Sequence, residues 1–187
     1  MNTTAPFASP LIDSILFETA ERLVKERITG FRKGTTDVPN WTHSLRVRDA
    51  LQKHGFSEDV IMAGLLHDIV EDGNTSLEEL KELGFSEAVI QLIDLCSHNQ
   101  SVAGTEARWL TMMARLTAAH NPSAWAIKLA DLIDNLHSCH TMPEERQQFM
   151  RDVKGELMLR LTEQMMRGSE LWRELGEAVK FVDVFKN

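Results

Sequence analysis

Cysteines and long apolar runs are scarce in this sequence. Its two cysteines, Cys96 and Cys139, lie far apart and form no C-x-x-C pair, which argues against a zinc knuckle and a disulfide framework. No apolar run approaches the ~20 residues that cross a bilayer. The first residues, MNTTAPFASPLIDSIL, lack the basic region and long apolar segment of a signal peptide. We therefore expect a protein of the reducing cytoplasm that binds no membrane.

Excess positive charge and glycine-rich loops are also missing. Lysine and arginine number 20 against 28 aspartates and glutamates, which gives a formal net charge of -8 and a pI near 5.4. This balance argues against the broad basic face that duplex nucleic acid requires, so an anionic substrate would need local cations. The chain has no repeat, low-complexity tract or glycine-rich phosphate loop, so neither a Rossmann nor a P-loop site is indicated.

The chain does have the composition of an ordinary globular protein, with 43% hydrophobic and 26% charged residues, and helix punctuation from end to end. Cap residues, first-turn prolines and closing glycines predict the helices. These run from Pro10 to Gly30, Trp41 to Leu51, Ser57 to about Val70, Ser76 to Gly84, Ser86 to about Ser97, 106 to 119 and 121 to 138, with two more beginning at Pro143 and Ser169. Only the tail VKFVDVF has strand character.

The pattern predicts a single all-α domain over residues 1–187. Its motif-bearing core would span about 31–140, and C-terminal helices would span about 143–180. The sequence indicates no role for these last helices beyond packing or pairing with another subunit. A homo-oligomer is therefore one possible assembly.

The stretch AGLLHDIVEDG places His67, Asp68, Glu71 and Asp72 directly after an apolar run. Charged groups this close to buried aliphatic residues are costly unless something binds them or water reaches them. In an α-helix, positions four apart share a face, so His67 would lie beside Glu71 and Asp68 beside Asp72. Gly64 costs the helix about 1 kcal/mol relative to alanine, which predicts a close neighbour at that position.

A second cluster lies in AIKLADLIDNLHS, where Lys128, Asp131, Asn135 and Ser138 form a polar stripe on an otherwise aliphatic helix. Alone, such a stripe is typical of an exposed face; together with the first cluster it indicates a site. Two imidazoles and two carboxylates suit Mn²⁺, Fe²⁺, Co²⁺ or Zn²⁺ better than Mg²⁺ or Ca²⁺. Three ligands would be His67, Asp68 and Asp131. The fourth would be one of the remaining histidines: His43, His54, His98, His120, His137 or His140.

The order His43, then His67-Asp68, then Asp131 resembles the H…HD…D metal set of the HD-domain phosphohydrolases. More narrowly, HDIVED with KLADLIDNL is similar to the hydrolase domain of the RelA/SpoT proteins and to the small alarmone hydrolases, which remove the 3′-pyrophosphate of guanosine tetra- and pentaphosphate. The resemblance runs from about Phe31 to Ser138. It implies an HD-domain helical bundle and a guanosine-3′,5′-bis(diphosphate) 3′-pyrophosphohydrolase.

The resemblance also implies a role for each matched residue. One divalent ion, expected to be Mn²⁺, would have four ligands: His43, His67, Asp68 and Asp131. Two catalytic carboxylates would handle the attacking water and proton transfer: Glu71 and Asp72. Four side chains would contact the nucleotide: Arg32, Lys33, Asn135 and Ser138. Water activated by the ion would attack the 3′-linked phosphorus and release pyrophosphate.

Two departures from the family bear on the substrate and leave the metal set intact. The family usually has a tyrosine shortly before the first histidine and a proline just after it, where this chain has Asn40 and Ser44 and contains no tyrosine. The later segment DLCSHNQ replaces a Val-Thr segment with a substrate-facing lysine. These differences favour, as an alternative, another HD-domain nucleotide phosphatase or pyrophosphohydrolase, such as a 5′-nucleotidase. A non-catalytic nucleotide or metal sensor is a third hypothesis, against which the intact Glu71 and Asp72 count.

Several other residues have a structural interpretation. Trp109 and Trp125 are surrounded by helix-spaced methionines and leucines and are predicted to be core residues. Cys96 and Cys139 are predicted to be buried small hydrophobic residues. Asp134 is expected either at the surface or as a partner of a metal ligand.

Overall fold

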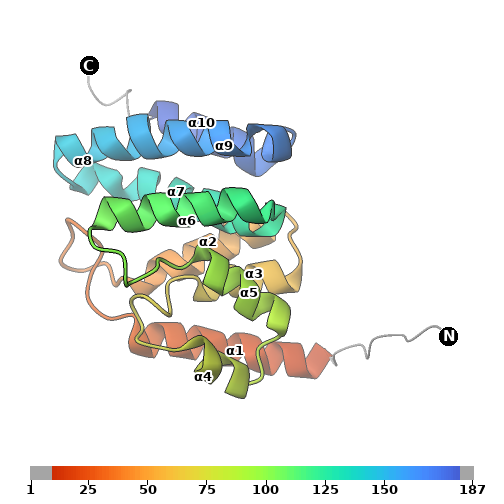
Figure 1. The fold of residues 1–187 in the computed structure, drawn as a ribbon. Coiled ribbons are helices and arrows are strands. Elements are labelled where there is room, and N and C mark those ends of the chain that lie inside the picture. Colours follow the sequence, from red (N-terminus) through yellow and green to blue (C-terminus); the bar gives the residue numbers. More distant parts are fainter. Residues whose placement is uncertain (1–9, 182–187) are drawn as a thin grey trace.

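The computed structural model describes residues 10–181, and within them the chain is built from helices (Figure 1). The α-helices are α1 (Pro10–Arg27), α2 (Trp41–Lys53), α3 (Glu58–Leu66), α4 (Leu77–Glu82), α5 (Glu87–Cys96), α6 (Thr105–Ala119), α7 (Pro122–Ser138), α8 (Glu144–Gln148), α9 (Glu156–Met166) and α10 (Glu170–Phe181). A 3-10 helix, η1 (Cys139–Thr141), follows α7, and a π-helix, η2 (Phe149–Gly155), joins α8 to α9. The predicted all-α class is confirmed.

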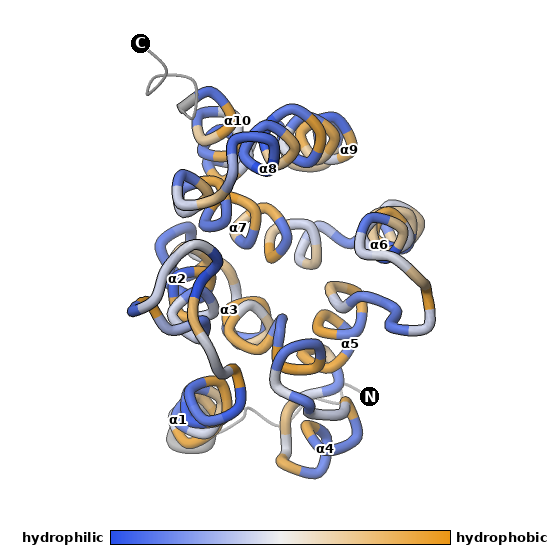
Figure 2. Tube along the Cα trace, turned by 90° about the vertical axis from the view of Figure 1, so that its left-hand side faces the viewer, coloured by the Kyte–Doolittle hydropathy of each residue, from blue (hydrophilic) through white to orange (hydrophobic). Residues whose placement is uncertain are grey.

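Helix α3 lies at the centre of the fold. It packs against α1, α2, α5 and α7, and Figure 2 shows these helices arranged around it. Its residues from Met62 to Leu66 are all buried, which confirms that this nearly all-apolar segment is a core helix. Trp109 and Trp125 are buried as predicted, and so are both cysteines.

Side-chain caps begin several helices where the sequence predicts them. Ser76 and Ser86 each accept a hydrogen bond from a backbone N–H in the first turn of α4 and α5. Asn121 accepts two such bonds ahead of Pro122, the first residue of α7. These bonds satisfy N–H groups that the helices cannot pair themselves.

The predicted helix through Val70 is shorter in the structure. Helix α3 ends at Leu66, and residues 67–73 form turns and a bend. The backbone bond to the carbonyl of Leu66 spans only three residues, at 2.9 Å, and the ring of His67 bonds to the carbonyl of Gly64. A tighter turn and a side-chain competitor thus replace regular helical pairing. The motif residues from His67 to Asp72 therefore follow α3 and are not part of it, although Asp72 N still bonds to Asp68 O, four residues back, as in a helix.

Both ends of the chain carried predictions that the structure covers only in part. The strand character of VKFVDVF is wrong for residues 179–181, which are the last residues of α10. Residues 182–185 of that segment lie outside the described residues, as does Ser9, the predicted cap of α1.

Gly64 lies where α3 packs on α2. A Cβ atom at this position would lie 2.2 Å from Leu51 Cδ1 and 3.5 Å from Val47 Cγ1, and both of these residues are fully buried. The close neighbour that the sequence predicts is thus α2, the helix that carries His43. Glycine at this position lets the two helices that lead to His43 and His67 approach each other.

Replacing Gly64 by valine is expected to lower the free energy of unfolding by about 1–3 kcal/mol, the usual cost of overpacking a core. Urea unfolding measures this change. Gly176→Val is the matched control, because a Cβ atom at Gly176 in α10 would meet nothing within 4 Å. Equal free energies of unfolding for the two variants would contradict the close packing of α3 on α2.

The loop between α1 and α2 is held against the segment that follows α7. Thr141 Oγ1 donates a hydrogen bond to Lys33 O at 2.8 Å. Gly34 has a φ of +80°, and a Cβ atom there would lie 2.2 Å from Thr141 O, so the contact requires a residue without a side chain. This contact holds the loop that carries Arg32 and Lys33 beside the last turn of α7.

The C-terminal helices cover α7 from the other side. Helix α10 and the π-helix η2 both pack on α7, and Leu171 and Leu175 of α10 are buried.

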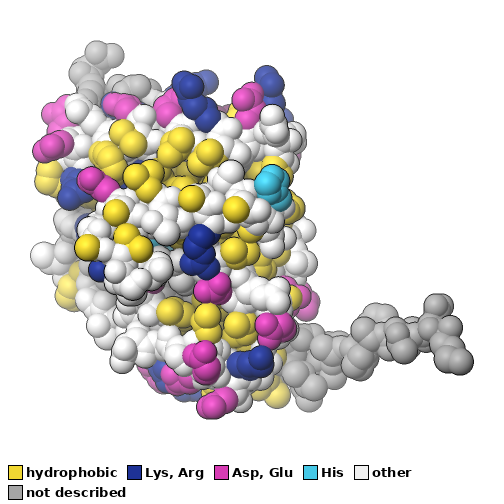
Figure 3. Space-filling view, viewed as in Figure 1, with side chains coloured by type: hydrophobic (Ala, Val, Ile, Leu, Met, Phe, Trp, Pro, Cys, Tyr) yellow, Lys and Arg dark blue, Asp and Glu magenta, His cyan; other side chains and the backbone are white. Residues whose placement is uncertain are grey.

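Among the described residues, no helix combines the length and the apolar character that a membrane crossing demands. Figure 3 shows acidic side chains gathered over α4 at the lower edge of one face, in keeping with the net charge of -8. The predicted absence of membrane and nucleic-acid partners stays a prediction.

Candidate metal centre and active site

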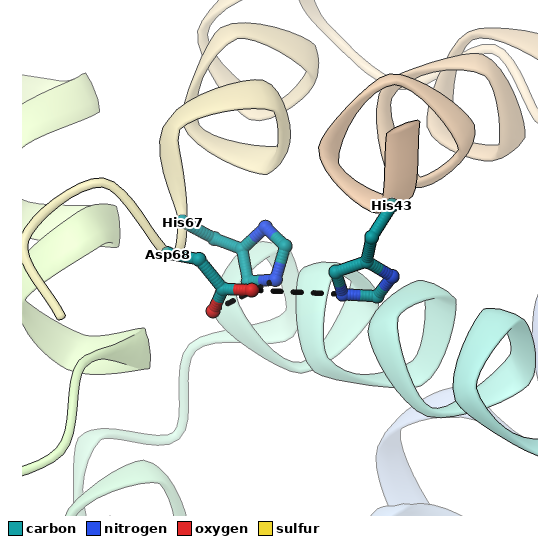
Figure 4. Close-up of side chains that lie close together, drawn as sticks. All are labelled: His43, His67 and Asp68. Carbon is teal, nitrogen blue, oxygen red and sulfur yellow. Dashed lines mark ion pairs between the residues drawn. The ribbon is translucent and has the colours of Figure 1, made fainter. Parts of the chain in front are cut away.

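Three side chains from α2 and from the end of α3 converge at one place (Figure 4). His43 comes from the first turn of α2, and His67 and Asp68 follow the last residue of α3. His67 Nε2 lies 3.1 Å from Asp68 Oδ1, and His43 Nε2 lies 3.7 Å from Asp68 Oδ2. Metal–ligand bonds of roughly 2.1 Å place neighbouring ligand atoms about 3.0–3.5 Å apart. The cluster therefore has nearly the spacing of a metal-binding set.

The two ring nitrogens of His67 have different surroundings. Nδ1 lies 2.8 Å from the carbonyl oxygen of Gly64, so it donates its proton there and Nε2 carries a lone pair. Within the described residues, Nε2 is buried and has no hydrogen-bond partner. A buried lone pair that faces the Asp68 carboxylate is unfavourable unless a cation lies between them. The donor set therefore fits a divalent ion.

His43 is held from both sides. Its Nδ1 donates to Asp134 Oδ2 at 2.6 Å, and its Nε2 lies 3.1 Å from Asp131 Oδ1. Burial by itself lowers the pKa of His43, but these hydrogen bonds outweigh burial and raise the pKa from 6.5 to about 9. The sequence left Asp134 either at the surface or as a partner of a metal ligand. The structure shows the partner: Asp134 is buried, and it bonds to His43 and to Arg46. A carboxylate behind a histidine fixes the ring and raises its basicity.

Asp131 reaches the same cluster from α7. Its Oδ1 lies 3.1 Å from His43 Nε2 and 4.0 Å from His67 Nε2. Lys128 donates to Oδ2, and Asn135 donates to Oδ1 at 2.5 Å. Burial raises the pKa of the Asp131 carboxyl, but Lys128 and His43 outweigh burial and hold that pKa well below its usual range. The polar stripe of α7 therefore faces the cluster and is no exposed face, since Lys128 is buried.

The two predicted catalytic carboxylates have different surroundings. Glu71 accepts hydrogen bonds from the backbone and from the ring of His98. Asp72 lies at the exposed edge of the site, and its backbone N–H bonds to Asp68 O at 2.8 Å. Partial burial, followed by the charges of Asp68 and Glu71, raises the pKa of Asp72, and Lys33 opposes this effect. A carboxyl whose pKa is raised beside a metal-binding cluster suits proton transfer.

Arg32 joins three of the predicted nucleotide-binding residues into one group. Its Nη2 donates to Asn135 Oδ1 at 2.8 Å and to Ser138 Oγ at 3.0 Å. The same nitrogen lies 3.3 Å from Asp134 Oδ2, the carboxylate that holds His43. Lys33 is exposed, and its charge acts on Asp72. The nucleotide-binding candidates thus lie beside the metal-binding cluster.

A further cation lies near this group. The ammonium of Lys154, in η2, lies 5.1 Å from the ring centre of Trp109 and 6.0 Å from that of Phe149. Burial lowers the pKa of Lys154, and the carboxylate of Asp131 opposes burial. Lys128 belongs to the polar stripe that the sequence indicates, because it lies three residues before Asp131 on the same helix. Nothing local in the sequence indicates Lys154, because its place depends on how η2 packs on α7.

The metal-free protein is expected to become less stable as the pH rises from 6.5 to about 9. The pKa of His43 is raised to about 9 in the folded state from its usual 6.5, so between these values the folded state holds a proton that the unfolded state has released. This contribution is complete below pH 6.5 and is lost as the pH passes about 9. Urea unfolding of metal-stripped protein across this range measures it.

The control for this prediction is His43→Gln, which has no ring to take up the proton. Its free energy of unfolding should vary less with pH over the same range. If the free energy of unfolding of the wild type rose with pH, the charged state assigned to His43 would be wrong.

The fold and the site together define a class of protein, an all-α domain in which the start of α2, the end of α3 and the middle of α7 bring two histidines and two aspartates to one place beside further carboxylates. The chain belongs to the HD domain family, whose sequence model matches residues 18–156. The family resemblance stated from the motifs is therefore confirmed. That residues 1–187 form a single domain stays a prediction.

Several known proteins resemble the chain. A GTP pyrophosphokinase of Streptomyces coelicolor is 32% identical over 143 residues, which are 74% of this chain and 17% of that protein. The guanosine-3′,5′-bis(diphosphate) 3′-pyrophosphohydrolase MESH1 of Xenopus tropicalis is 31% identical over 129 residues, 66% of this chain and 68% of that protein. A solved structure described as a metazoan orthologue of SpoT that hydrolyses ppGpp has a TM-score of 0.74 at 24% identity and covers 95% of this chain and 98% of its own. The match thus spans only 17% of the length of the Streptomyces coelicolor protein, and the same share of a probable GTP pyrophosphokinase of Mycobacterium leprae.

Proposed function

We propose that the chain is a metal-dependent phosphohydrolase that releases pyrophosphate from the 3′ position of guanosine tetraphosphate or a close relative. The observation that carries the proposal is the buried Nε2 of His67, which has no hydrogen-bond partner among the described residues and faces Asp68 at near metal-ligand spacing. The name of the Xenopus tropicalis relative supports the substrate, because that protein is named for this reaction.

Four residues would hold one divalent ion: His43, His67, Asp68 and Asp131. We propose Mn²⁺, because a mixed set of imidazoles and carboxylates suits a borderline ion better than Mg²⁺ or Ca²⁺. When bound, such an ion neutralises phosphate oxygens and makes water a better nucleophile near neutral pH.

Glu71 and Asp72 would divide the proton transfers between them. Water adds to the 3′-linked phosphorus, and the bond from this phosphorus to the 3′ oxygen breaks. Glu71, whose oxygens are fixed by His98, would take the proton of the water. Asp72, whose pKa is raised by partial burial and neighbouring carboxylates, would give a proton to the departing 3′ oxygen. The products are GDP and pyrophosphate.

The side chains around Arg32 would bind the nucleotide. Within the described residues, the side-chain hydrogen bonds of Arg32 use only Nη2, which leaves Nη1 and Nε of its planar group to donate to phosphate. Lys33 and Lys154 would add positive charge on the same side of the site. In a protein with a net charge of -8, this local set of cations supports an anionic substrate.

A substrate panel tests the proposal and its alternatives. Wild-type protein with Mn²⁺ is incubated with guanosine tetraphosphate, guanosine pentaphosphate and a set of 5′-mononucleotides, and kcat/KM is measured for each. The proposal expects kcat/KM for the 3′-pyrophosphorylated nucleotides to exceed the others by at least about a hundredfold. Preferred release of phosphate from 5′-mononucleotides would support the 5′-nucleotidase alternative. The absence of tyrosine from the chain favours this alternative. Binding without turnover would favour a sensor.

A further inference from the structure

The carboxylate of Glu71 is fixed by one residue of a distant loop. Its Oε1 accepts a hydrogen bond from His98 N at 2.8 Å, and its Oε2 lies 2.6 Å from His98 Nδ1. His98 lies directly after Ser97, the C-cap residue that follows α5. A single donor would leave the carboxylate free to turn about its last torsion, whereas these two donors hold both of its oxygens.

The bond to Glu71 fixes which ring nitrogen of His98 carries a proton. An ionised carboxylate only accepts hydrogen bonds, so Nδ1 carries the proton that it donates. Nε2 of His98 is buried and has no hydrogen-bond partner among the described residues. A second proton on Nε2 would therefore be a buried donor without an acceptor. The bond to Glu71 thus requires a proton on Nδ1.

The loop that carries His98 is itself anchored. Ser97 is buried, and its Oγ donates to Ile93 O at 2.8 Å. Arg115 of α6 donates to Ser97 O at 3.4 Å and forms an ion pair with Asp94 at 2.8 Å. These bonds fix the backbone next to His98 and so hold its two donors in place, which a positioning role requires.

We propose that His98 is a positioning residue that holds the Glu71 carboxylate in the orientation in which it accepts the proton of the attacking water. This inference rests on the proposed function, because Glu71 acts only within that reaction. Loss of the ring removes one of the two donors and leaves the backbone bond. The metal-binding candidates keep their own supports, since His67 is held by Gly64 and His43 by Asp134. The expected loss is therefore in kcat, with metal affinity unchanged.

Three variants of His98 separate position from bulk. In His98→Asn the amide nitrogen takes the place of Nδ1, so the bond to Glu71 can be remade. In His98→Gln the amide nitrogen falls near Nε2, and His98→Ala has no donor. We expect His98→Ala and His98→Gln to lower kcat by about 10–100-fold, the usual cost of a misplaced catalytic group. KM and Mn²⁺ affinity should stay within about twofold, and His98→Asn should keep most of kcat.

A double-mutant cycle with Glu71→Gln tests whether His98 acts through Glu71. The inference expects His98→Ala to cause no further loss of kcat once Glu71 has been replaced. An equal loss of kcat in both backgrounds would overturn it, and so would wild-type kcat in His98→Ala and His98→Gln.

An NMR measurement keeps this result separate from the proposed function. Protein labelled with ¹⁵N at histidine should show His98 with its proton on Nδ1 in the wild type, and this signal should shift strongly in Glu71→Gln. If the wild type turned over no nucleotide, the proposed function would fail, and the NMR signal would still decide the pairing. A His98 ring protonated on Nε2 and unaffected by Glu71→Gln would overturn the inference whatever the activity.

Discussion

The variant His67→Asn is expected to fold and to lose Mn²⁺-dependent hydrolysis by about a thousandfold or more. A bound ion supplies several kcal/mol of transition-state stabilisation, and each 1.4 kcal/mol or so is a factor of ten in rate. The asparagine amide nitrogen takes the place of Nδ1, which bonds to Gly64 O at 2.8 Å in the wild type. The variant lacks Nε2, the atom proposed to bind the ion. It therefore removes the ligand and keeps the bond that shapes the end of α3.

Mn²⁺ affinity and kcat/KM of the same preparations measure this effect. The matched control is His137→Asn, because His137 is exposed on α7 and should leave both quantities within about twofold of the wild type. Wild-type affinity for Mn²⁺ together with wild-type kcat/KM in His67→Asn would show that the ion and the reaction do not depend on this nitrogen, and the proposed site would be wrong.

The variant Asp72→Asn is expected to lower kcat by about 10²–10⁴-fold, the usual contribution of a general acid or base. The pKa of Asp72 is raised by partial burial and by the charges of Asp68 and Glu71, so in the wild type this carboxyl keeps its proton to a higher pH than usual. A general acid works only while it is protonated, so the rate should fall as the pH rises through this pKa. That limb of the pH profile should be absent in Asp72→Asn.

The pH profile of kcat and the affinity for Mn²⁺ are measured together. Asp49→Asn is the control, because Asp49 is exposed on α2 and forms an ion pair with Arg48. An Asp72→Asn variant with wild-type kcat would remove Asp72 from the mechanism. A lowered kcat that is fully explained by lost Mn²⁺ would instead assign Asp72 to the metal site.

Helix starts could be predicted from the sequence because their causes are local. The side chains of Ser76, Ser86 and Asn121 each bond to N–H groups only two or three residues further on, and such pairs can be read from the chain. The end of α3 could not be predicted in this way. It depends on a bond from the ring of His67 to the carbonyl of Gly64, which no apolar periodicity reveals.

The candidate site also contains features that the sequence could predict and features that it could not. The order of the motifs predicted that His43, His67, Asp68 and Asp131 act together, and the structure places them side by side; their role as ligands stays a prediction. Asp134 lies three residues after Asp131 on the same helix, so the sequence could name it as a partner. The pairing of His98 with Glu71 spans 27 residues, and it depends on loop geometry that one sequence does not specify.

Product analysis after incubation with guanosine tetraphosphate tests the central claim most directly. Metal-stripped wild-type protein is incubated with this nucleotide, with and without Mn²⁺, and the products are separated by ion-exchange chromatography. The account predicts GDP and pyrophosphate in equal amounts when Mn²⁺ is present, and intact nucleotide when it is absent. Intact guanosine tetraphosphate in the presence of protein-bound Mn²⁺, or release of single phosphates in place of pyrophosphate, would contradict it.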